Sequence, residues 1–209
     1  MKTLLLTGFE PLGGDRVNPS QVAAGALDGL QVGAFRVRSA LLPVDAARAP
    51  GVLRALLAET RPEAILLTGL AAGRPQLSLE RVALNVQDFR LPDNAGVTRQ
   101  GEPVVPGGPD AYLSTLPLPA ILEAWRAAGL PGFISDTAGL YLCNLAMYVA
   151  RHHVGPGVPC GFLHLPASAE VALDARQPLP YLPQPEITRG VRLALEAVAR
   201  ALSDAMTEA

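Results

Sequence analysis

Two cysteines and three histidines are the side chains of this 209-residue chain best suited to nucleophilic chemistry. Cys143 is the more suggestive cysteine, because a polar stretch containing Gly139 precedes it and an apolar run follows it. This pattern predicts a turn and then a helix, whose positive end stabilises a thiolate. We place the helix start near Leu142, which leaves the backbone N–H of Cys143 free of helical hydrogen bonds. The alternative is a buried cysteine that acts as a small hydrophobic residue.

A cysteine nucleophile needs a general base within hydrogen-bond reach. His152 and His153 lie roughly 14 Å along the predicted helix from Cys143, at about 1.5 Å of rise per residue. They are better placed to interact with the negative end of that helix. His164 ends a short apolar run that predicts a strand. It is therefore the partner by elimination, although a lone histidine in a strand is more often structural.

The base in turn needs a third group that orients it. Glu80 interrupts an alternating apolar pattern over residues 76–86, where two adjacent charges require a bulge or a bend that turns one of them inward. Glu10, Asp88 and Asp93 remain alternatives, and spacing alone ranks Glu80 only slightly above Glu10. No cysteine or histidine spacing is typical of a metal site, so we expect neither a metal ion nor a cofactor.

The elements that must position these residues alternate between strand-like and helical patterns. This alternation predicts an α/β protein, a three-layer α/β/α sandwich with a mostly parallel central sheet, forming a single catalytic domain over residues 1–209. Residues 87–110 predict a long irregular loop, and residues 166–185 show no regular pattern. The expected strands are 2–7, 35–42, 64–68, 76–86, 133–135 and 159–165, and the expected helices are 19–30, 45–59, 119–128, 142–153 and 187–206.

The composition excludes several classes of partner. Only 17% of the residues are charged and the net charge is -2, so no basic surplus is present to bind nucleic acid. No apolar stretch approaches the length of a membrane span, so we expect no membrane partner. The N-terminal apolar run is three leucines, too short for an export signal, which favours a cytoplasmic protein with free thiols.

Six sequence blocks follow one another along most of the chain. They are GFEPLGG with NPS (residues 8–14 and 18–20), GLAAGR (69–74), LERVALN (79–85), RLPDN (90–94), TAGLYLCN (137–144) and FLHLP (162–166). Together these blocks resemble pyroglutamyl peptidase I, a cysteine peptidase family also called pyrrolidone-carboxylate peptidase. Any one block is weak evidence, but six in the family's order are strong evidence.

The resemblance implies an α/β/α sandwich and a catalytic triad. In it, Cys143 is the nucleophile, His164 is the general base and acid, and Glu80 is the orienting carboxylate. It further implies that Arg90 and the backbone N–H of Cys143 hold the oxyanion. The implied reaction is hydrolysis of the N-terminal pyroglutamyl group of a peptide through a thioester.

The resemblance also implies a substrate pocket, with Phe9, Leu12, Asn18, Leu70 and Ala71 as the expected binding residues. The chain departs from the family at two of these positions. The family commonly has a second phenylalanine in place of Leu12 and a glutamine in place of Leu70. The first change removes an aromatic contact worth roughly 0.5–1.5 kcal/mol.

Two alternatives to this activity remain open. One is a thiol hydrolase of the same fold that acts on a different small cyclic or acyl amide, and the other is a non-enzymatic α/β binding module. The resemblance suggests a homo-oligomer, a tetramer or a dimer, with pyroglutamylated peptides as substrates. The proline-rich span 165–185 is a candidate for the contact surface.

Overall fold

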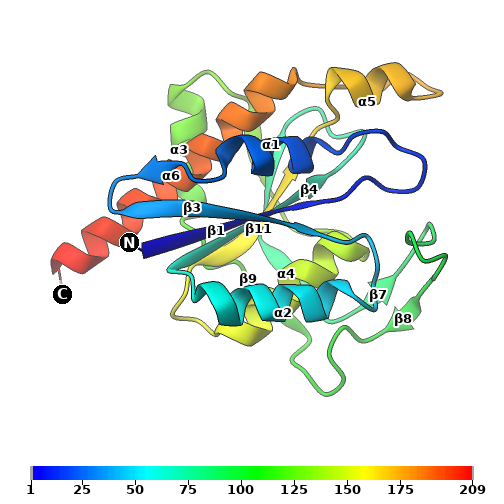
Figure 1. The fold of residues 1–209 in the computed structure, drawn as a ribbon, viewed down its shortest axis with the longest axis horizontal. Coiled ribbons are helices and arrows are strands. Elements are labelled where there is room, and N and C mark those ends of the chain that lie inside the picture. Colours follow the sequence, from blue (N-terminus) through cyan, green and yellow to red (C-terminus); the bar gives the residue numbers. More distant parts are fainter. Residues whose placement is uncertain (1, 209) are drawn as a thin grey trace.

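The structure, a computed structural model, describes residues 2–208 and is built around a seven-stranded sheet (Figure 1). The order of the strands across the sheet is β10-β5-β11-β4-β1-β3-β2. These strands are β1 (Lys2–Phe9), β2 (Gln31–Val32), β3 (Phe35–Leu42), β4 (Ala64–Leu70), β5 (Leu77–Glu80), β10 (Gly132–Ser135) and β11 (Cys160–Leu165). The helices are α1 (Pro19–Leu27), α2 (Ala49–Thr60), α3 (Leu118–Ala127), α4 (Leu142–Val154), α5 (Ala169–Asp174) and α6 (Gln184–Glu208).

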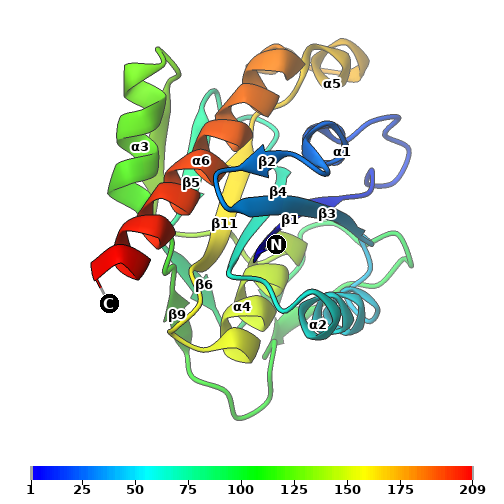
Figure 2. The same ribbon diagram turned by 60° about the vertical axis from the view of Figure 1, so that its left-hand side comes forward.

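Helices cover both faces of this sheet. Helices α1, α3 and α6 pack with one face, and α2 and α4 pack with the other (Figure 1). Helix α6 also packs against α3, as Figure 2 shows from a second side. The interior strand β1 is apolar on both sides, because Leu4 and Leu6 enter one core while Leu5 enters the other. The expected three-layer α/β architecture is therefore confirmed.

The direction of β5 is the main departure from a simple parallel sheet. Strand β11 pairs in parallel with β4 but antiparallel with β5, and β2 is antiparallel to β3. Only a short turn, residues 71–76, separates β4 from β5, so the chain reverses without a helical crossover. As a result, Ser78 of β5 lies opposite His164 of β11.

The alternating segment 76–86 bends at the two adjacent charges, as predicted. The chain leaves the main sheet after Glu80, and Val82–Leu84 forms β6, which pairs with β9 (Ala111–Leu113) in a separate two-stranded sheet. Glu80 is fully buried, whereas Arg81 is exposed. The long segment that follows contains a further small pair, β7 (Gln87–Asp88) and β8 (Gln100–Glu102).

Several element boundaries differ from the prediction for local reasons. Helix α2 begins at Ala49, a few residues after the predicted cap Asp45. The Asp45 carboxylate does act as a cap, because it accepts hydrogen bonds from the N–H groups of Ala47 and Arg48 in the turn that leads into the helix. Helix α1 ends at Leu27, since Gly29 adopts φ +74° and turns the chain. The short helix α5 was not predicted; Ser168 caps it by accepting from the Val171 N–H.

Within residues 2–208, no helix has the length and apolar composition needed to cross a membrane.

Candidate active site

The site lies on the face of the sheet that α4 covers. Alternation along β5 sends Leu77 and Leu79 into the core beneath α3 and α6, so Ser78 and Glu80 point to the opposite face. Strand β11 brings His164 to that same face, next to Ser78. The two strands therefore place a carboxylate and an imidazole side by side.

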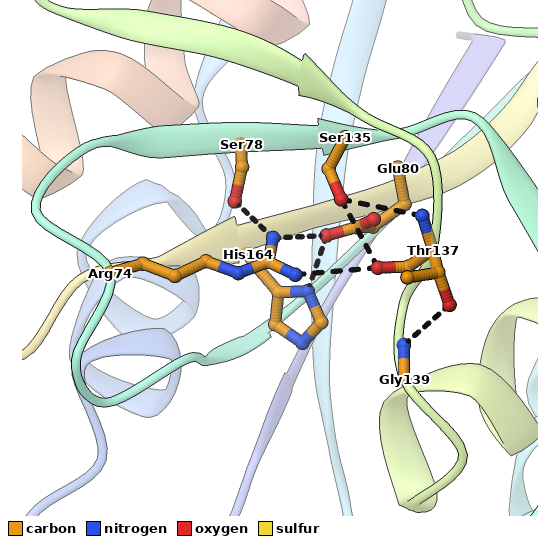
Figure 3. Close-up of polar contacts among 7 residues, drawn as sticks. All are labelled: Arg74, Ser78, Glu80, Ser135, Thr137, Gly139 and His164. Atoms are coloured by element: carbon orange, nitrogen blue, oxygen red, sulfur yellow. Dashed lines mark hydrogen bonds and ion pairs between the residues drawn. The ribbon is translucent and has the colours of Figure 1, made fainter.

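Glu80 and His164 are joined by a short hydrogen bond. Nδ1 of His164 lies 2.7 Å from Oε1 of Glu80, and both side chains are buried. A carboxylate can only accept, so Nδ1 carries the hydrogen and the neutral ring keeps a lone pair on Nε2. In Figure 3 this second nitrogen faces away from Glu80. The arrangement leaves Nε2 free to accept a proton.

Cys143 lies at the start of α4, as the sequence predicted. The helix begins at Leu142, and Gly139 lies in the preceding turn with φ +75°, a conformation that glycine adopts without strain. Leu145 makes the first helical bond, to the Tyr141 carbonyl. The N–H of Cys143 precedes it, among the groups that have no acceptor within a helix.

A glycine on β4 makes room for the thiol. Gly69 pairs in register with His164, and a Cβ added to Gly69 would lie only 2.8 Å from Sγ of Cys143 and 2.9 Å from Cζ of Phe162. The rings of Phe162 and His164 are in turn 4.8 Å apart, centroid to centroid. Sγ and the imidazole therefore share one region of the sheet face.

Arg74 is a further member of this cluster. Its Nη1 lies 2.6 Å from Oε1 of Glu80 and 2.6 Å from Oγ of Ser78, and its Nη2 donates to the Thr137 carbonyl at 3.3 Å (Figure 3). Sequence reasoning placed Arg74 only in a turn and in one family block. The sequence signal that could have indicated Arg74 was Glu80, since a carboxylate that points into a core needs a nearby cation.

Burial dominates the ionisation of the thiol and the imidazole. The pKa of Cys143 is raised to about 12, first by burial and then by Glu80, against smaller lowering effects of Arg74 and of its own backbone N–H. The pKa of His164 is lowered, because burial and Arg74 outweigh Glu80. The helix start acts on the thiol in the expected direction, but the expected net stabilisation of a thiolate is absent from this resting structure.

A cavity of about 580 Å³ opens beside the loop that leads to Cys143. Its lining includes Leu12, Ala71 and Arg90, three of the residues expected at the oxyanion or substrate site. Gly139 and Tyr141 line it from the side of α4. Burial raises the pKa of Tyr141 to about 12, and its hydroxyl donates to the Pro92 carbonyl, so the phenol stays neutral.

The other expected pocket residues lie elsewhere. Phe9 is buried at the end of β1, and Leu70 lines a separate cavity of about 170 Å³. Asn18 caps α1: its Oδ1 accepts from the N–H and hydroxyl of Ser20, and its Nδ2 donates to the Glu10 carbonyl. The amide of Asn18 is thus already engaged in holding the local backbone.

The alternative acids are positioned away from the imidazole. Glu10 accepts hydrogen bonds from the Val44 N–H and from the Asn94 side chain. These two bonds join the three loops that carry Glu10, Val44 and Asn94. Asp93 accepts from three backbone N–H groups, which lowers its pKa although its partial burial acts the other way. Asp88 lines the larger cavity. Over residues 2–208, no group of three or more histidine, cysteine, aspartate or glutamate side chains could hold a metal ion.

A thiol, an imidazole and a carboxylate on one face of an α/β sheet are the groups that cysteine hydrolases use. The family model described as pyroglutamyl peptidase matches residues 1–201. A pyrrolidone-carboxylate peptidase of Deinococcus radiodurans is 57% identical over 206 residues, covering 95% of this chain and 94% of that protein. A crystal structure of pyrrolidone carboxyl peptidase from Pyrococcus furiosus superposes with a TM-score of 0.92 at 39% identity, covering 96% and 99% of the two chains.

The chain therefore belongs to the pyroglutamyl peptidase family. The family resemblance that the six sequence blocks carry is confirmed.

Proposed function

We propose that this protein is a cysteine exopeptidase that hydrolyses the N-terminal pyroglutamyl group of peptides. The observation that supports it most is the Glu80–His164 hydrogen bond beside Cys143, in a chain that matches the family over nearly its whole length. The same three residues are those that the sequence blocks assign to the triad.

The proposed reaction begins with a proton transfer. His164 takes the thiol proton on Nε2 while Sγ of Cys143 attacks the pyroglutamyl carbonyl carbon that is bonded to the peptide nitrogen. The carbonyl oxygen becomes an oxyanion, which the N–H of Cys143 and the guanidinium of Arg90 stabilise. Glu80 keeps the imidazole in the required tautomer and stabilises the imidazolium that forms.

Collapse of this intermediate breaks the carbon–nitrogen bond. His164 gives its proton to the departing amine, and the acyl group remains on Cys143 as a thioester. A water molecule then attacks the thioester while His164 accepts one of its protons. Pyroglutamate leaves as the free acid, and the proton returns to the Cys143 sulfur, which restores the resting thiol.

The proposed pocket suits a small uncharged ring. A pyroglutamyl peptide has no N-terminal ammonium, so its recognition requires no acidic partner. Leu12 and Ala71 supply apolar surface in the larger cavity, next to the loop that carries Cys143. Phe9 and Leu70 lie at the ends of β1 and β4 and are not among the residues that line this cavity.

Release of a fluorophore from a pyroglutamyl amide tests this activity directly. We expect turnover by the native protein and a loss of roughly 10³-fold or more in kcat for Cys143→Ser and for His164→Gln, since triad members act as a unit. Asn18→Ala is compared with these variants as a change at an expected pocket residue outside the triad. The amide of Asn18 already bonds to the backbone of Glu10 and Ser20. No turnover at micromolar enzyme between about pH 6 and pH 9 would contradict the proposal.

A second candidate substrate class is another small cyclic or acyl amide. The observation that favours it is the pair Leu12 and Leu70, which replace a phenylalanine and a glutamine common in the family. A panel of blocked peptides separates the two: preference for pyroglutamyl over acetyl-alanyl and prolyl peptides supports the first proposal. Equal or better turnover of acetyl-alanyl peptides supports the second.

Self-association and a cytoplasmic location also stay predictions. The span 165–185, suggested as a contact surface, presents Leu173 with 83% and Tyr181 with 53% of their surface exposed. They are the exposed apolar side chains that a second copy of the chain could cover on this span. We expect light scattering to give a dimer or a tetramer, and Leu173→Glu to shift the protein toward the monomer if this surface is used.

A further inference from the structure

Arg74 joins two parts of the site that come from distant segments of the chain. Its guanidinium reaches Glu80 and Ser78 on β5 and the Thr137 carbonyl in the loop between β10 and α4 (Figure 3). The side chain of Arg74 is 28% exposed, whereas that of Glu80 is completely buried. Arg74 thus brings a charge from the edge of the site to a carboxylate that water does not reach.

The carboxylate depends on this contact because its bonds are concentrated on one oxygen. Oε1 of Glu80 receives both Arg74 and His164, at 2.6 and 2.7 Å. Oε2 is buried and has no hydrogen-bond partner within residues 2–208. A buried carboxylate with so few donors is costly unless a cation balances its charge. Arg74 is the cation that bonds it.

The contact with Thr137 extends the cluster toward the nucleophile. The Ser135 hydroxyl donates to the Thr137 carbonyl, and the Thr137 hydroxyl accepts from the Gly139 N–H (Figure 3). Gly139 lies in the turn that precedes the start of α4 and Cys143. The guanidinium therefore holds the acid of the triad and the loop before its nucleophile with adjacent nitrogens.

We propose that Arg74 is a positioning residue of this site, which balances the buried carboxylate of Glu80 and holds it aimed at His164 while it fixes the loop before Cys143. The inference rests on the proposed function, because it assigns Arg74 to the same triad. Arg74 acts on the reaction through Glu80 and the Thr137 loop, so it is not itself a catalytic residue.

The charges around His164 give this role a measurable signature. Glu80 from β5, Arg74 from the turn before it and the Cys143 thiol from α4 are the titratable groups of the cluster. Arg74 lowers the pKa of His164, and Glu80 raises it. Loss of the guanidinium should thus raise the pKa of the imidazole, because a neighbouring positive charge disfavours the imidazolium.

The test compares Arg74→Gln with Arg74→Lys and with the control Arg81→Gln. Arg81 pairs with Asp136 at the exposed surface, next in sequence to Glu80, and its side chain bonds no triad member. For Arg74→Gln we expect at least a tenfold loss of kcat, little change in KM, and an acid limb of kcat/KM that moves to higher pH. For Arg74→Lys we expect the acid limb of kcat/KM to stay at its native pH, because the positive charge is kept. We expect kcat to fall by less than in Arg74→Gln, since the lysine ammonium lacks the planar pair of donors of a guanidinium.

Each outcome decides the inference. A folded Arg74→Gln variant with the kcat and acid limb of Arg81→Gln would overturn it. If Arg74→Gln fails to fold, Arg74→Lys decides, because native kcat in that variant contradicts the need for two adjacent donors. An NMR titration of the His164 ring in the native and Arg74→Gln proteins measures its pKa without turnover. An unchanged pKa overturns the inference, whereas absent turnover by the native protein overturns the proposed function instead.

Discussion

At the sulfur of Cys143, two effects oppose one another. The helix start and Arg74 favour the thiolate, whereas burial and the carboxylate of Glu80 favour the thiol. Burial is the largest effect and raises the pKa to about 12, so the resting thiol of Cys143 is protonated. A lowered pKa of His164 agrees with this state, because a neutral imidazole can accept the thiol proton during attack.

The pH dependence of alkylation tests the protonation state of Cys143. Iodoacetamide reacts with the thiolate, so we expect the rate constant to rise by roughly tenfold per pH unit from pH 6 to pH 9 without a plateau. Mass spectrometry of the modified protein follows the reaction, and Cys143→Ser gives the background from Cys160. A rate that is flat around pH 7 would instead indicate a preformed thiolate–imidazolium pair.

A methyl group on Gly69 should displace the sulfur of Cys143. Its Cβ would lie 2.8 Å from Sγ of Cys143 and 2.9 Å from the Phe162 ring, closer than real contacts allow. We expect Gly69→Ala to lower kcat/KM on the order of 10²-fold, since a shift of about 1 Å has such an effect. The fluorogenic assay measures this loss.

The matched control adds a methyl group where space is open. A Cβ on Gly25, inside α1, meets nothing within 4 Å. Gly25→Ala should leave kcat/KM unchanged and stabilise the fold by roughly 0.5–1 kcal/mol. Native activity in Gly69→Ala would show that Sγ does not occupy the place described.

Among the elements, α4 has to hold its first turn in place while leaving its N–H groups free. Asn144 does this from the residue after the nucleophile. Its side chain is fully buried, accepts from the Leu84 N–H and donates to the carbonyls of Leu84 and Val86. Helix α4 is thereby fixed to β6 and to the start of the long segment that carries Arg90.

Removal of this amide should destabilise the whole fold. Asn144→Ala leaves three partly buried backbone groups without this partner, and a fully buried group of this kind costs about 1–3 kcal/mol. We expect the free energy of unfolding to fall by roughly 3 kcal/mol or more, measured by urea denaturation. Gln31→Ala, at an exposed site, should change it by less than about 0.5 kcal/mol. A similarly small change for Asn144→Ala would contradict the role of Asn144.

The sequence predicted these elements well where the signal was local. Alternation located Glu80 and its bend, and the glycine before Cys143 located the helix start. The antiparallel entry of β5 was not predictable in this way, because a strand's direction depends on its partner, β11, some eighty residues later. Arg74 was missed for the same reason: its contacts with Glu80 and Thr137 depend on that pairing. Resemblance to a family indicated the proposed triad residues without showing which contacts hold them.

For the molecule as a whole, the buried imidazole makes stability depend on pH. The pKa of His164 is lowered from the ordinary value of 6.5, so the unfolded chain binds its proton more readily than the folded protein does. The free energy of unfolding therefore decreases as the pH falls below about 6.5, toward the lower pKa of the folded state.

Denaturation at several pH values tests this linkage. Between about pH 5 and pH 6.5 we expect the native protein to lose stability on acidification. His164→Gln should show a smaller slope over the same range, because it removes the group that titrates. Equal slopes would mean that other groups account for the dependence. Asp93 does not interfere, since its lowered pKa moves its effect to more acidic solutions.

The unequal burial of the two free cysteines has a practical consequence. Cys143 is partly accessible, whereas Cys160 has no exposed surface at the start of β11. A chromogenic disulfide reagent should thus count one sulfhydryl per chain in native solution and two in denaturant. The thiol counted in native solution is that of Cys143, so this count reports the fraction of molecules with an intact Cys143. Reaction of the second thiol, that of Cys160, reports opening of the sheet. One colorimetric titration can therefore separate loss of the reactive thiol from loss of the fold in every variant described above that keeps both cysteines.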